Sequence, residues 1–420
     1  MAAKKLQSIR GIHDGLPAEV RLWQRVESAA RQVFSTYAFS EVRLPILEPT
    51  ELFVRSIGEA TDIVSKEMYA FTDQGNDNIC LRPEGTAGSV RAYLQGGLTR
   101  SGTQRWFYIG PMFRRERPQK GRLRQFQQIG VEMFGANGPL EDAEVLAMAH
   151  NFLSELGISG LQLEVNSLGC SACRPAYREA LLTYLNQHSD KLCETCVERV
   201  DKNPMRVLDC KEPACQAELN DAPEMVNHLC DGCEAHFSGL KTGLAALNVP
   251  YKINARIVRG LDYYNRTAFE IVTDQLGSQG TVLAGGRYDG LVTELGGPAT
   301  SAIGFAAGLE RLGMLLNESD AAVVDVAVVA LGESVLAYSM QQAAQLRGAG
   351  FSVVHCGGGS AKRQFKVADR EGARFVVVIG EEEMQQARVT LKDMGTGDQQ
   401  QLSVDALTAA LGKSSQAVTV

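Results

Sequence analysis

The stretch YIGPMFRRERPQKGRLRQFQQIGVE, residues 108–132, decides the fold of this chain. Residues 105–116 and 125–134 both follow a period of two, which is the side-chain repeat of a β-strand. The charged loop ERPQKGRLR separates the two segments. We therefore predict that they form an antiparallel pair of strands.

The alternation also predicts what the faces of this strand pair do. It puts Gly110, Arg114 and Glu116 on one face of the first strand, and it groups Gln128 with Glu132 on one face of the second. A polar strand face is often merely solvated. Glycine and arginine together on one strand pair favour a ligand platform instead.

The loop between the strands is strongly basic. Residues 114–124 hold six basic side chains and one acidic side chain, a local charge of +5. The whole chain carries 42 lysines and arginines against 49 aspartates and glutamates, a net charge of −7. Contact with a nucleic acid must therefore come from local patches, because the overall field does not attract phosphate. This loop is a candidate phosphate-binding patch.

Composition excludes some classes of protein. The 420 residues are 45% hydrophobic and 22% charged, which is typical of a globular protein. Runs of about 18 apolar residues, as in a membrane span, do not occur, and the first 15 residues lack the apolar centre of a signal peptide. We expect a cytoplasmic protein whose ten cysteines are thiols or metal ligands rather than disulfides.

The texture of the sequence changes several times along the chain. Helical spacing over 17–38 predicts an amphipathic helix at the start of the fold. We expect core segments at 1–165 and 251–320, separated by a cysteine-rich helical insertion at 166–250. After the hinge-like NESDAAVVD, apolar runs alternate with helical patterns, which predicts a small α/β domain with a largely parallel sheet at 325–420.

Segments along nearly the whole chain resemble class II aminoacyl-tRNA synthetases, and in particular the histidyl-tRNA synthetases. Residues 108–132 resemble motif 2 in the form that this family uses. The other matching segments, in chain order, are EVRLPILEPTELF (41–53, motif 1), RPEGTAG (82–88, the amino-acid-binding loop), RGLDYYNRTAFE (259–270) and LAGGRYDGL (283–291), which are the two histidine signatures, and GFAAGLERL (304–312, motif 3).

The resemblance implies an α/β fold class with an α+β catalytic core. Its parts would be a class II antiparallel sheet flanked by helices, a helical insertion, and a C-terminal α/β anticodon-binding domain. It implies a homodimer joined through motif 1. It also implies a histidine–tRNA ligase, which activates L-histidine with ATP and Mg²⁺ and transfers it to the 3′ end of histidine tRNA.

The resemblance assigns the cationic residues to adenylate formation. Arg114 and Arg259 are the expected catalytic residues: Arg114 would contact the α-phosphate, and Arg259 would bind the histidine carboxylate and the α-phosphate. Arg311 would hold the γ-phosphate, and Glu116 would complete the ATP site. Cations offset the repulsion between the carboxylate and the phosphates, and a guanidinium offers the bidentate geometry that lysine lacks.

A second group of residues matches positions that recognise histidine. A neutral imidazole has one donor and one acceptor nitrogen, which a carboxylate and a phenol can satisfy together. The resemblance gives this task to Glu132 and Tyr264. The other residues expected around the amino acid are Glu84, Gly85, Thr86, Gln128, Tyr263 and Tyr288.

The basic loop is expected to read the acceptor end of the tRNA. In the family this loop recognises the extra 5′ guanosine of histidine tRNA. An arginine supplies charge to a phosphate, whereas a glutamine can pair with a base edge. We expect Arg117 and Gln119 to be the direct contacts. The alternative is that the loop only clamps ATP.

Eight cysteines gather within 64 residues of the insertion. Three CxxC pairs, 170/173, 193/196 and 230/233, enclose Cys210 and Cys215, a spacing suited to tetrahedral zinc. Reduced cysteines also serve as small apolar core residues. Structural zinc stays open at this point, and no catalytic metal is expected among these residues.

Three other functions compete with this interpretation. A non-catalytic regulatory paralogue would lack the anticodon domain and would have eroded catalytic motifs. A prolyl or threonyl enzyme would lack the RGLDYY and AGGRYDG signatures. A zinc-stapled RNA-binding module would not need the three arginines at 114, 259 and 311.

Overall fold

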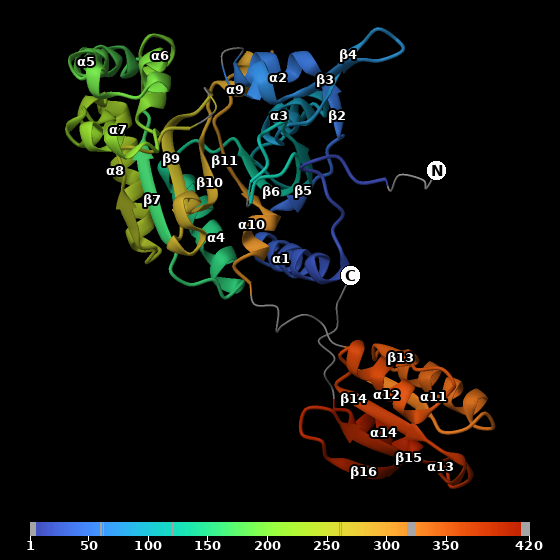
Figure 1. Cartoon of the computed structure of the whole chain (residues 1–420). Helices are drawn as coiled ribbons and strands as arrows, with labels where there is room; N and C mark the ends of the chain where they lie inside the picture. The colour runs from blue at the N-terminus through green and yellow to red at the C-terminus, as the bar shows by residue number, and fades with distance from the viewer. Residues whose placement is uncertain are drawn as a thin grey trace. The chain divides into compact units, whose positions relative to one another are not determined.

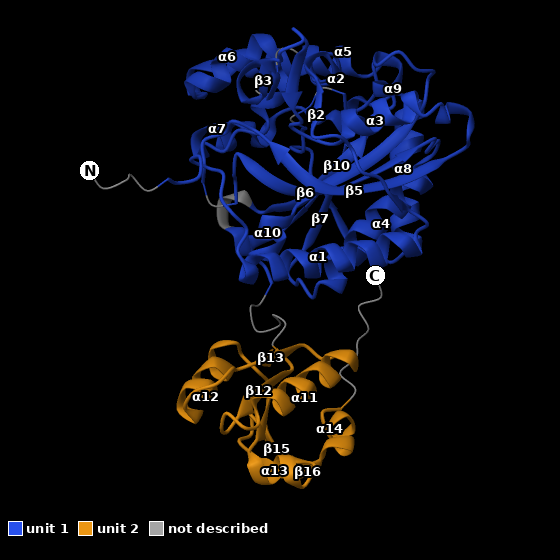
Figure 2. Cartoon of the chain, turned by 90° about the vertical axis from the view of Figure 1, so that its right-hand side faces the viewer, with its two compact units in different colours: residues 1–318 blue, residues 319–420 orange. Residues whose placement is uncertain are grey.

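The chain forms two compact units, residues 1–318 and 319–420 (Figures 1 and 2). The computed structural model describes residues 6–58, 61, 63–119, 121–259, 261, 263–316 and 324–412. Lys120 of the basic loop, Gly260 and Asp262 of the first histidine signature, and hinge residues 317–323 lie outside these ranges.

An eight-stranded sheet organises the described part of the large unit, in the order β1-β5-β6-β11-β10-β9-β7-β8. Its strands are β1 (Ser40–Glu41), β5 (Gln104–Phe113), β6 (Gln125–Phe134), β7 (Gln162–Ser167), β8 (Tyr251–Ile253), β9 (Asn265–Val272), β10 (Thr281–Arg287) and β11 (Ala302–Gly308). A smaller sheet contains β2 (Leu47–Pro49), β3 (Tyr69–Thr72) and β4 (Asn78–Leu81).

The predicted strand pair is confirmed as β5 and β6. They pair antiparallel from Gln104↔Phe134 to Phe113↔Gln125, so β5 ends three residues before its predicted limit at residue 116. The antiparallel prediction for the sheet holds in its centre but is wrong at both edges. There, β1 pairs with β5 and β8 pairs with β7 in parallel, which makes the sheet mixed.

Helices cover both faces of this sheet (Figure 1). The helices of the large unit are α1 (Pro17–Thr36), α2 (Thr50–Ile57), α3 (Thr86–Gln95), α4 (Pro139–Glu155), α5 (Arg174–Gln187), α6 (Glu194–Lys202), α7 (Pro213–Glu218), α8 (Asp231–Ala246), α9 (Leu291–Glu294) and α10 (Leu309–Gly313). Helices α1, α4 and α8 share the main hydrophobic core with one sheet face, and α3 and α9 pack on the other.

The period of two explains why the sheet has two distinct faces. Ile129, Val131 and Met133 of β6 enter the main core with α1 and α4. The intervening residues of β6, among them Gln128 and Glu132, face the opposite side and are also buried. This second face therefore has a polar interior that can serve a ligand.

The helical insertion has its own small core. Cysteines 173, 196, 210, 215 and 233 pack there with leucines of α5. Its last helix behaves differently, because Phe237, Leu240 and Leu244 of α8 join the main core. Helix α8 thus packs on α4 and on β9 of the large sheet.

The small unit is an α/β domain with a five-stranded sheet in its described part, in the order β13-β12-β14-β15-β16. Its elements are β12 (Val326–Ala330), α11 (Leu336–Gly348), β13 (Val353–His355), α12 (Ala361–Arg370), β14 (Phe375–Ile379), α13 (Glu381–Gln385), β15 (Arg388–Asp393), β16 (Gln399–Ser403) and α14 (Val404–Ala410). Strands β13, β12 and β14 are parallel, as predicted, whereas β15 and β16 add an antiparallel edge that the prediction missed.

None of the helices in the described ranges combines the length and the apolar character that a membrane crossing requires.

Candidate active site

A cavity of about 250 Å³ opens on the polar face of the large sheet. Eight residues singled out from the sequence line it: Glu84, Thr86, Arg114, Gln128, Arg259, Tyr263, Tyr264 and Arg311. The other lining residues are Tyr108, Leu261, Thr281, Val282, Leu283, Ala284, Phe305, Ala306 and Gly308. Six predicted residues lie outside the lining: Gly85, Glu116, Arg117, Gln119, Glu132 and Tyr288.

Tyr108 is a site residue that the sequence analysis did not name. It lies on β5 two residues before Gly110, so the same alternation puts it on the ligand face. Gly85 and Gly130 make room for its ring, because a Cβ at either position would lie within 2.2 Å of ring carbon Cζ. The signal was therefore present in the sequence, but it needed the tertiary neighbours to be recognised.

Glu84 anchors the start of α3. Its carboxylate accepts hydrogen bonds from the backbone N–H groups of Thr86 at 2.6 Å and Ala87 at 2.9 Å. These N–H groups have no partner within the helix, and a negative charge is favoured at this end. Burial raises the pKa of Glu84, although both backbone hydrogen bonds oppose the shift. Each carboxylate oxygen keeps a second lone pair, so Glu84 can also accept a hydrogen bond from a donor group of a ligand.

Glu132 is the centre of a buried hydrogen-bond network behind the cavity wall. Only 1% of its surface is exposed. It accepts a hydrogen bond from Thr86 Oγ1 at 2.7 Å and another from the Tyr288 hydroxyl, while the Tyr108 hydroxyl lies 3.5 Å away. Burial raises the pKa of Glu132 to about 8, against the hydrogen bonds from Tyr288 and Thr86. Gly304 gives this carboxylate its space, since a Cβ there would meet Glu132 Oε2 at 2.0 Å.

Arg259 is held in place by an acid that the sequence analysis also missed. Its Nη1 donates to Glu270 Oε1 at 2.8 Å, and the other oxygen of Glu270 accepts a hydrogen bond from Thr281 at 2.8 Å. The guanidinium carbon lies 5.1 Å from the centre of the Tyr264 ring, within cation–π range. Arg259 thus enters the cavity with a defined orientation.

Two further arginines give the cavity its positive character. Arg114 donates from Nε to the Pro83 carbonyl at 2.8 Å, which fixes one edge of its guanidinium. Burial lowers the pKa of Arg311, and the nearby charge of Arg122 lowers it further. A buried cation beside another cation favours the arrival of an anion.

Three polar atoms of the lining have no hydrogen-bond partner among the described residues. They are Gln128 Oε1, Arg259 Nε and the Tyr263 hydroxyl. Buried polar groups are nearly always paired, and leaving one unpaired costs about 1–3 kcal/mol. These atoms therefore indicate a site that is completed by a polar ligand.

Beneath the cavity, Arg287 of the second histidine signature serves the fold. It is fully buried and pairs with Asp142, and its Nη1 lies 2.9 Å from Asp289 Oδ1. Arg287 bonds to both oxygens of Asp142, and Nε2 of His236 in α8 lies 2.8 Å from one of them, Oδ2. Burial alone would raise the pKa of Asp142, but these hydrogen bonds and the charge of Arg287 hold it below its ordinary value. This network fixes the strand end that carries Tyr288.

The basic loop begins where Arg114 leaves the cavity. Glu116 lies between two cations, 3.9 Å from Arg114 Nη1 and 3.3 Å from Arg122 Nη1. Arg117 and Gln119 are exposed. The loop turns back through paired backbone hydrogen bonds between Gln119 and Arg122, at 3.1 and 2.9 Å. The side chains at 117 and 119 are therefore accessible to a large partner.

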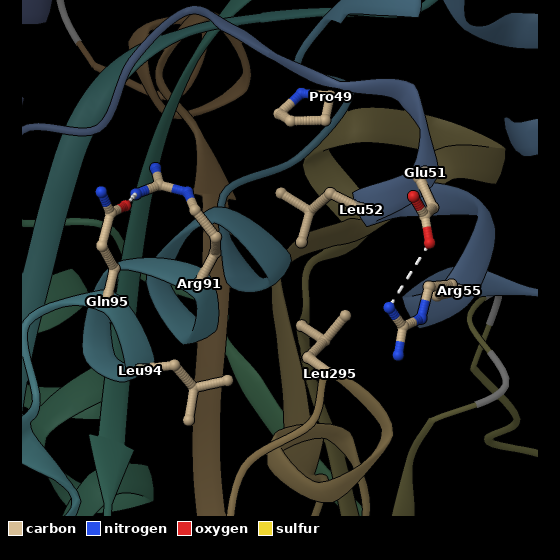
Figure 3. Close-up of a pocket in the computed structure, with 8 residues that line it drawn as sticks. All are labelled: Pro49, Glu51, Leu52, Arg55, Arg91, Leu94, Gln95 and Leu295. Carbon is tan, nitrogen blue, oxygen red and sulfur yellow. Dashed lines mark hydrogen bonds and ion pairs between the residues drawn. The ribbon is translucent and has the colours of Figure 1, made fainter.

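A second pocket, of about 320 Å³, lies away from this chemistry. Figure 3 shows its lining, in which Arg55 pairs with Glu51 and Arg91 with Gln95. Pro49 and Leu52 bring part of the predicted motif 1 to this surface. None of the three arginines predicted to act in adenylate formation, at 114, 259 and 311, lines it.

Family comparison agrees with the site. Residues 11–312 match the family model described as histidyl-tRNA synthetase. The chain belongs to the histidyl-tRNA synthetase family. Residues 325–414 match the model described as an anticodon binding domain, so this synthetase also has the module that a regulatory paralogue was expected to lack.

Solved structures resemble the synthetase over almost its whole length. The apo histidyl-tRNA synthetase of S. aureus is 34% identical, with a TM-score of 0.77, and the match covers 97% of this chain and 100% of that one. The histidyl-tRNA synthetase of a Nostoc species shares the fold at 21% identity, with a TM-score of 0.75 and coverage of 97% and 99%. A Bacillus halodurans protein described as an ATP phosphoribosyltransferase regulatory subunit/histidyl-tRNA synthetase shares it at 20% identity and a TM-score of 0.65, with coverage of 88% and 97%.

The expectations for family, fold and enzyme class are thus confirmed. This synthetase is a histidine–tRNA ligase of the class II fold with a C-terminal anticodon-binding domain. Histidine, ATP and tRNA are the partners that this family requires.

Proposed function

We propose that the 250 Å³ cavity is where histidine reacts with ATP. The observation that carries this proposal is the convergence of three arginines with three unpartnered buried polar atoms in one pocket. In the first step an oxygen of the histidine carboxylate attacks the α-phosphorus, and pyrophosphate leaves. In the second step a hydroxyl of the terminal tRNA ribose attacks the histidyl carbonyl, and AMP leaves.

The three arginines would bind the negatively charged groups of the two substrates. Arg259 is the proposed catalytic cation for the carboxylate and the α-phosphate, and Glu270 holds it there. Arg114 is the second catalytic cation, on the α-phosphate, and Arg311 takes the γ-phosphate. Fixed cations of this kind stabilise developing charge without reorganising during the step.

The amino acid would bind between the start of α3 and the buried network. We assign the α-ammonium to Glu84, Thr86 and Gln128, whose side chains supply acceptor oxygens at the cavity wall. Gly85 leaves the space for Tyr108 beside them.

The imidazole would bind deeper in the site. We assign its two nitrogens to Glu132 and Tyr264, while Tyr263 and Tyr288 enclose the ring. The 3.5 Å contact from Tyr108 is the longest of the three hydroxyl contacts to Glu132, so the imidazole N–H can most easily take its place. An analogue without this N–H would leave a buried acceptor unpaired, which gives sharp selectivity.

Magnesium is expected to accompany ATP. Its usual ligands are phosphate oxygens, waters and one or two carboxylates. Glu116 fits this role at the mouth of the site, because its two arginine neighbours are also suited to phosphate. When bound, the ion would neutralise part of the phosphate charge.

The tRNA would contact both units. We assign its acceptor end to the basic loop, with Arg117 on a phosphate and Gln119 on the extra 5′ guanosine. The anticodon would bind the small unit. We retain 1–165 and 251–320 as the catalytic core, 166–250 as the insertion and 325–420 as the anticodon-binding domain.

A homodimer is proposed through the motif 1 surface at 41–53. Ile46 and Leu47 expose 44% and 48% of their surfaces there, and Phe71 of the same small sheet exposes 48%. Apolar side chains gathered in this way favour a protein interface. We place the working dimer in the cytoplasm, where its tRNA is used.

Amino-acid-dependent exchange between ATP and pyrophosphate tests the proposed site most directly. Each of the twenty amino acids is offered in turn with labelled pyrophosphate, and only histidine should support exchange. Leu331→Ala, an exposed residue of the small unit, is a matched control that should exchange like the unaltered protein. Exchange with another amino acid, or none with histidine, would refute the assignment.

A further inference from the structure

Eight cysteines of the insertion form two groups of four in space. Cys170 and Cys173, just after β7, meet Cys230 and Cys233 at the start of α8. We call these four the base tetrad. The second group, the tip tetrad, consists of Cys193, Cys196, Cys210 and Cys215. Within each tetrad the four Sγ atoms all lie within 4.8 Å of one another.

The distances between sulfur atoms fit one tetrahedral metal ion in each tetrad. Zinc–sulfur bonds are about 2.3 Å long, and in a regular tetrahedron this gives sulfur–sulfur edges of about 3.8 Å. In the base tetrad, Cys170 Sγ lies 3.6 Å from Cys173 Sγ and 3.8 Å from Cys230 Sγ. In the tip tetrad, Cys193 Sγ lies 3.9 Å from Cys210 Sγ. A disulfide would need about 2.05 Å.

Backbone donors point at the sulfur atoms, as thiolate ligands require. The N–H of Cys230 donates to Cys173 Sγ at 3.1 Å, and the N–H of Cys193 donates to Cys215 Sγ at 3.1 Å. Hydrogen bonds of this kind offset the charge that four thiolates would bring to the site.

Burial in an apolar core is the competing explanation for these thiols. It accounts for single buried cysteines such as Cys80, which lies outside both tetrads. It does not account for Cys230, which is exposed, or for Cys170 and Cys193, which are half-buried. Between α5 and α8 the insertion has the short helices α6 and α7 and a small core, and folds with little core commonly depend on a structural metal.

We propose that each tetrad binds one structural Zn²⁺ ion. Four thiolates in tetrahedral geometry select zinc or iron–sulfur chemistry. Sulfur atoms 3.6–3.9 Å apart favour a single ion, because a multi-iron cluster would hold its cysteines farther apart. Binding displaces the thiol protons and joins chain segments that are far apart in sequence. The sites are structural, since four protein ligands leave no open position for a substrate.

The base tetrad lies where it can also support the backbone next to the candidate active site. It closes the insertion where the chain leaves β7 and returns through α8. Next to it, Leu168 N donates to Arg266 O at 2.6 Å, and Arg266 N donates to Gly169 O at 2.8 Å. Arg174 at the start of α5 also donates to the Tyr264 carbonyl. The base zinc therefore supports the backbone that carries Tyr263 and Tyr264.

Metal analysis of the purified full-length chain tests the proposal without relying on activity. After expression in zinc-supplemented medium, plasma mass spectrometry should find close to one zinc per tetrad. The variant Cys170→Ser/Cys230→Ser should lose the base zinc alone, and Cys193→Ser/Cys210→Ser the tip zinc alone. The matched control is Cys356→Ser, a half-buried cysteine of the small unit, which should keep both ions.

A chain without zinc, or double variants that keep the full zinc content, would overturn the proposal. Iron in place of zinc would also overturn it. Should a double variant fail to fold, zinc K-edge X-ray absorption on the unaltered protein replaces it. The expected result is sulfur ligands only, at about 2.3 Å. Nitrogen or oxygen ligands would show that the metal is held elsewhere.

Discussion

Replacing Glu132 by glutamine should change how histidine binding depends on pH. Burial raises the pKa of Glu132 to about 8, so the empty site holds mainly a neutral carboxyl at pH 7. The proposed contact with the imidazole N–H needs an acceptor, which is the ionised form. Binding must therefore expel a proton at neutral pH. A glutamine offers an acceptor oxygen at every pH and has no proton to lose.

The magnitude follows from the fraction of Glu132 that is ionised. With a pKa of about 8, roughly one tenth of the empty sites carry the carboxylate at pH 7 and roughly nine tenths at pH 9. From pH 7 to pH 9, the affinity of the unaltered protein for histidine should thus increase about tenfold relative to the affinity of Glu132→Gln. Taking the ratio of the two dissociation constants removes the titration of histidine itself, because both proteins meet the same ligand.

Isothermal titration calorimetry without ATP measures both consequences. Buffers with different ionisation enthalpies report the protons released on binding, about 0.9 per histidine at pH 7 and about 0.1 at pH 9 for the unaltered protein. The variant supplies the baseline at each pH. A flat ratio of dissociation constants, or one that changes in the opposite sense, would refute the reasoning, because Glu132 would then bind the ring while protonated or not at all.

The same pKa shift has a consequence for stability. The carboxyl has a pKa of about 4.5 when unfolded and about 8 when folded, so the folded state holds the proton more tightly. The free energy of unfolding should fall between these values as pH rises, by on the order of 1 kcal/mol per pH unit at most. The thermal midpoint of the unaltered protein should therefore decline relative to Glu132→Gln from pH 5 to pH 9.

Four other substitutions probe the site. Glu270→Gln should lower the turnover number for exchange about tenfold with little change in the Michaelis constant for histidine, because Arg259 loses the carboxylate that holds it. Arg259→His should lower the turnover number by about 10²–10³-fold. A change in the Michaelis constant alone would contradict both predictions. Gly304→Ala should weaken histidine binding and lower the thermal midpoint, because the new Cβ would lie 2.0 Å from Glu132 Oε2. Overpacking of this kind lowers the free energy of unfolding by about 1–3 kcal/mol. Unaltered histidine affinity would argue against this contact. Gln119→Ala should reduce discrimination between tRNAs with and without the extra guanosine while exchange stays intact; equal losses in exchange and aminoacylation would make the loop an ATP clamp.

Much of the fold followed from local pattern. Two-residue alternation predicted β5 and β6 and separated the core face from the ligand face of β6, because successive side chains of a strand point in opposite directions. Helical spacing predicted α1, which ends at Thr36, two residues early, where Ala38 adopts a φ of 60°. These features depend on neighbours along the chain, so they can be read without the tertiary structure.

Other features of the fold could not be predicted from the local sequence pattern. The edge strand β1 is two residues long, too short for its parallel pairing with β5 to leave a pattern. The helix α8 reads as part of the insertion, yet its apolar side chains enter the main core. Strand β16 begins with three glutamines, and its pairing with β15 is set by the register of the sheet. Tertiary packing overrides local preference at such positions.

For the site, the sequence by itself determined which side chains carry the chemistry, and the tertiary structure decided which of them meet. The arginines at 114, 259 and 311 were apparent from motifs, but Tyr108 and Glu270 were recognised only from their contacts, with Gly85 and Gly130 around the Tyr108 ring and with Arg259 at Glu270. The cysteines show the same division. Local spacing produced the three CxxC pairs, yet the pair at 170/173 bypasses its neighbour at 193/196 and joins 230/233. Spacing along a chain constrains only what is near in sequence, whereas convergence across 60 residues depends on the packing that offsets the entropy of closing so long a loop.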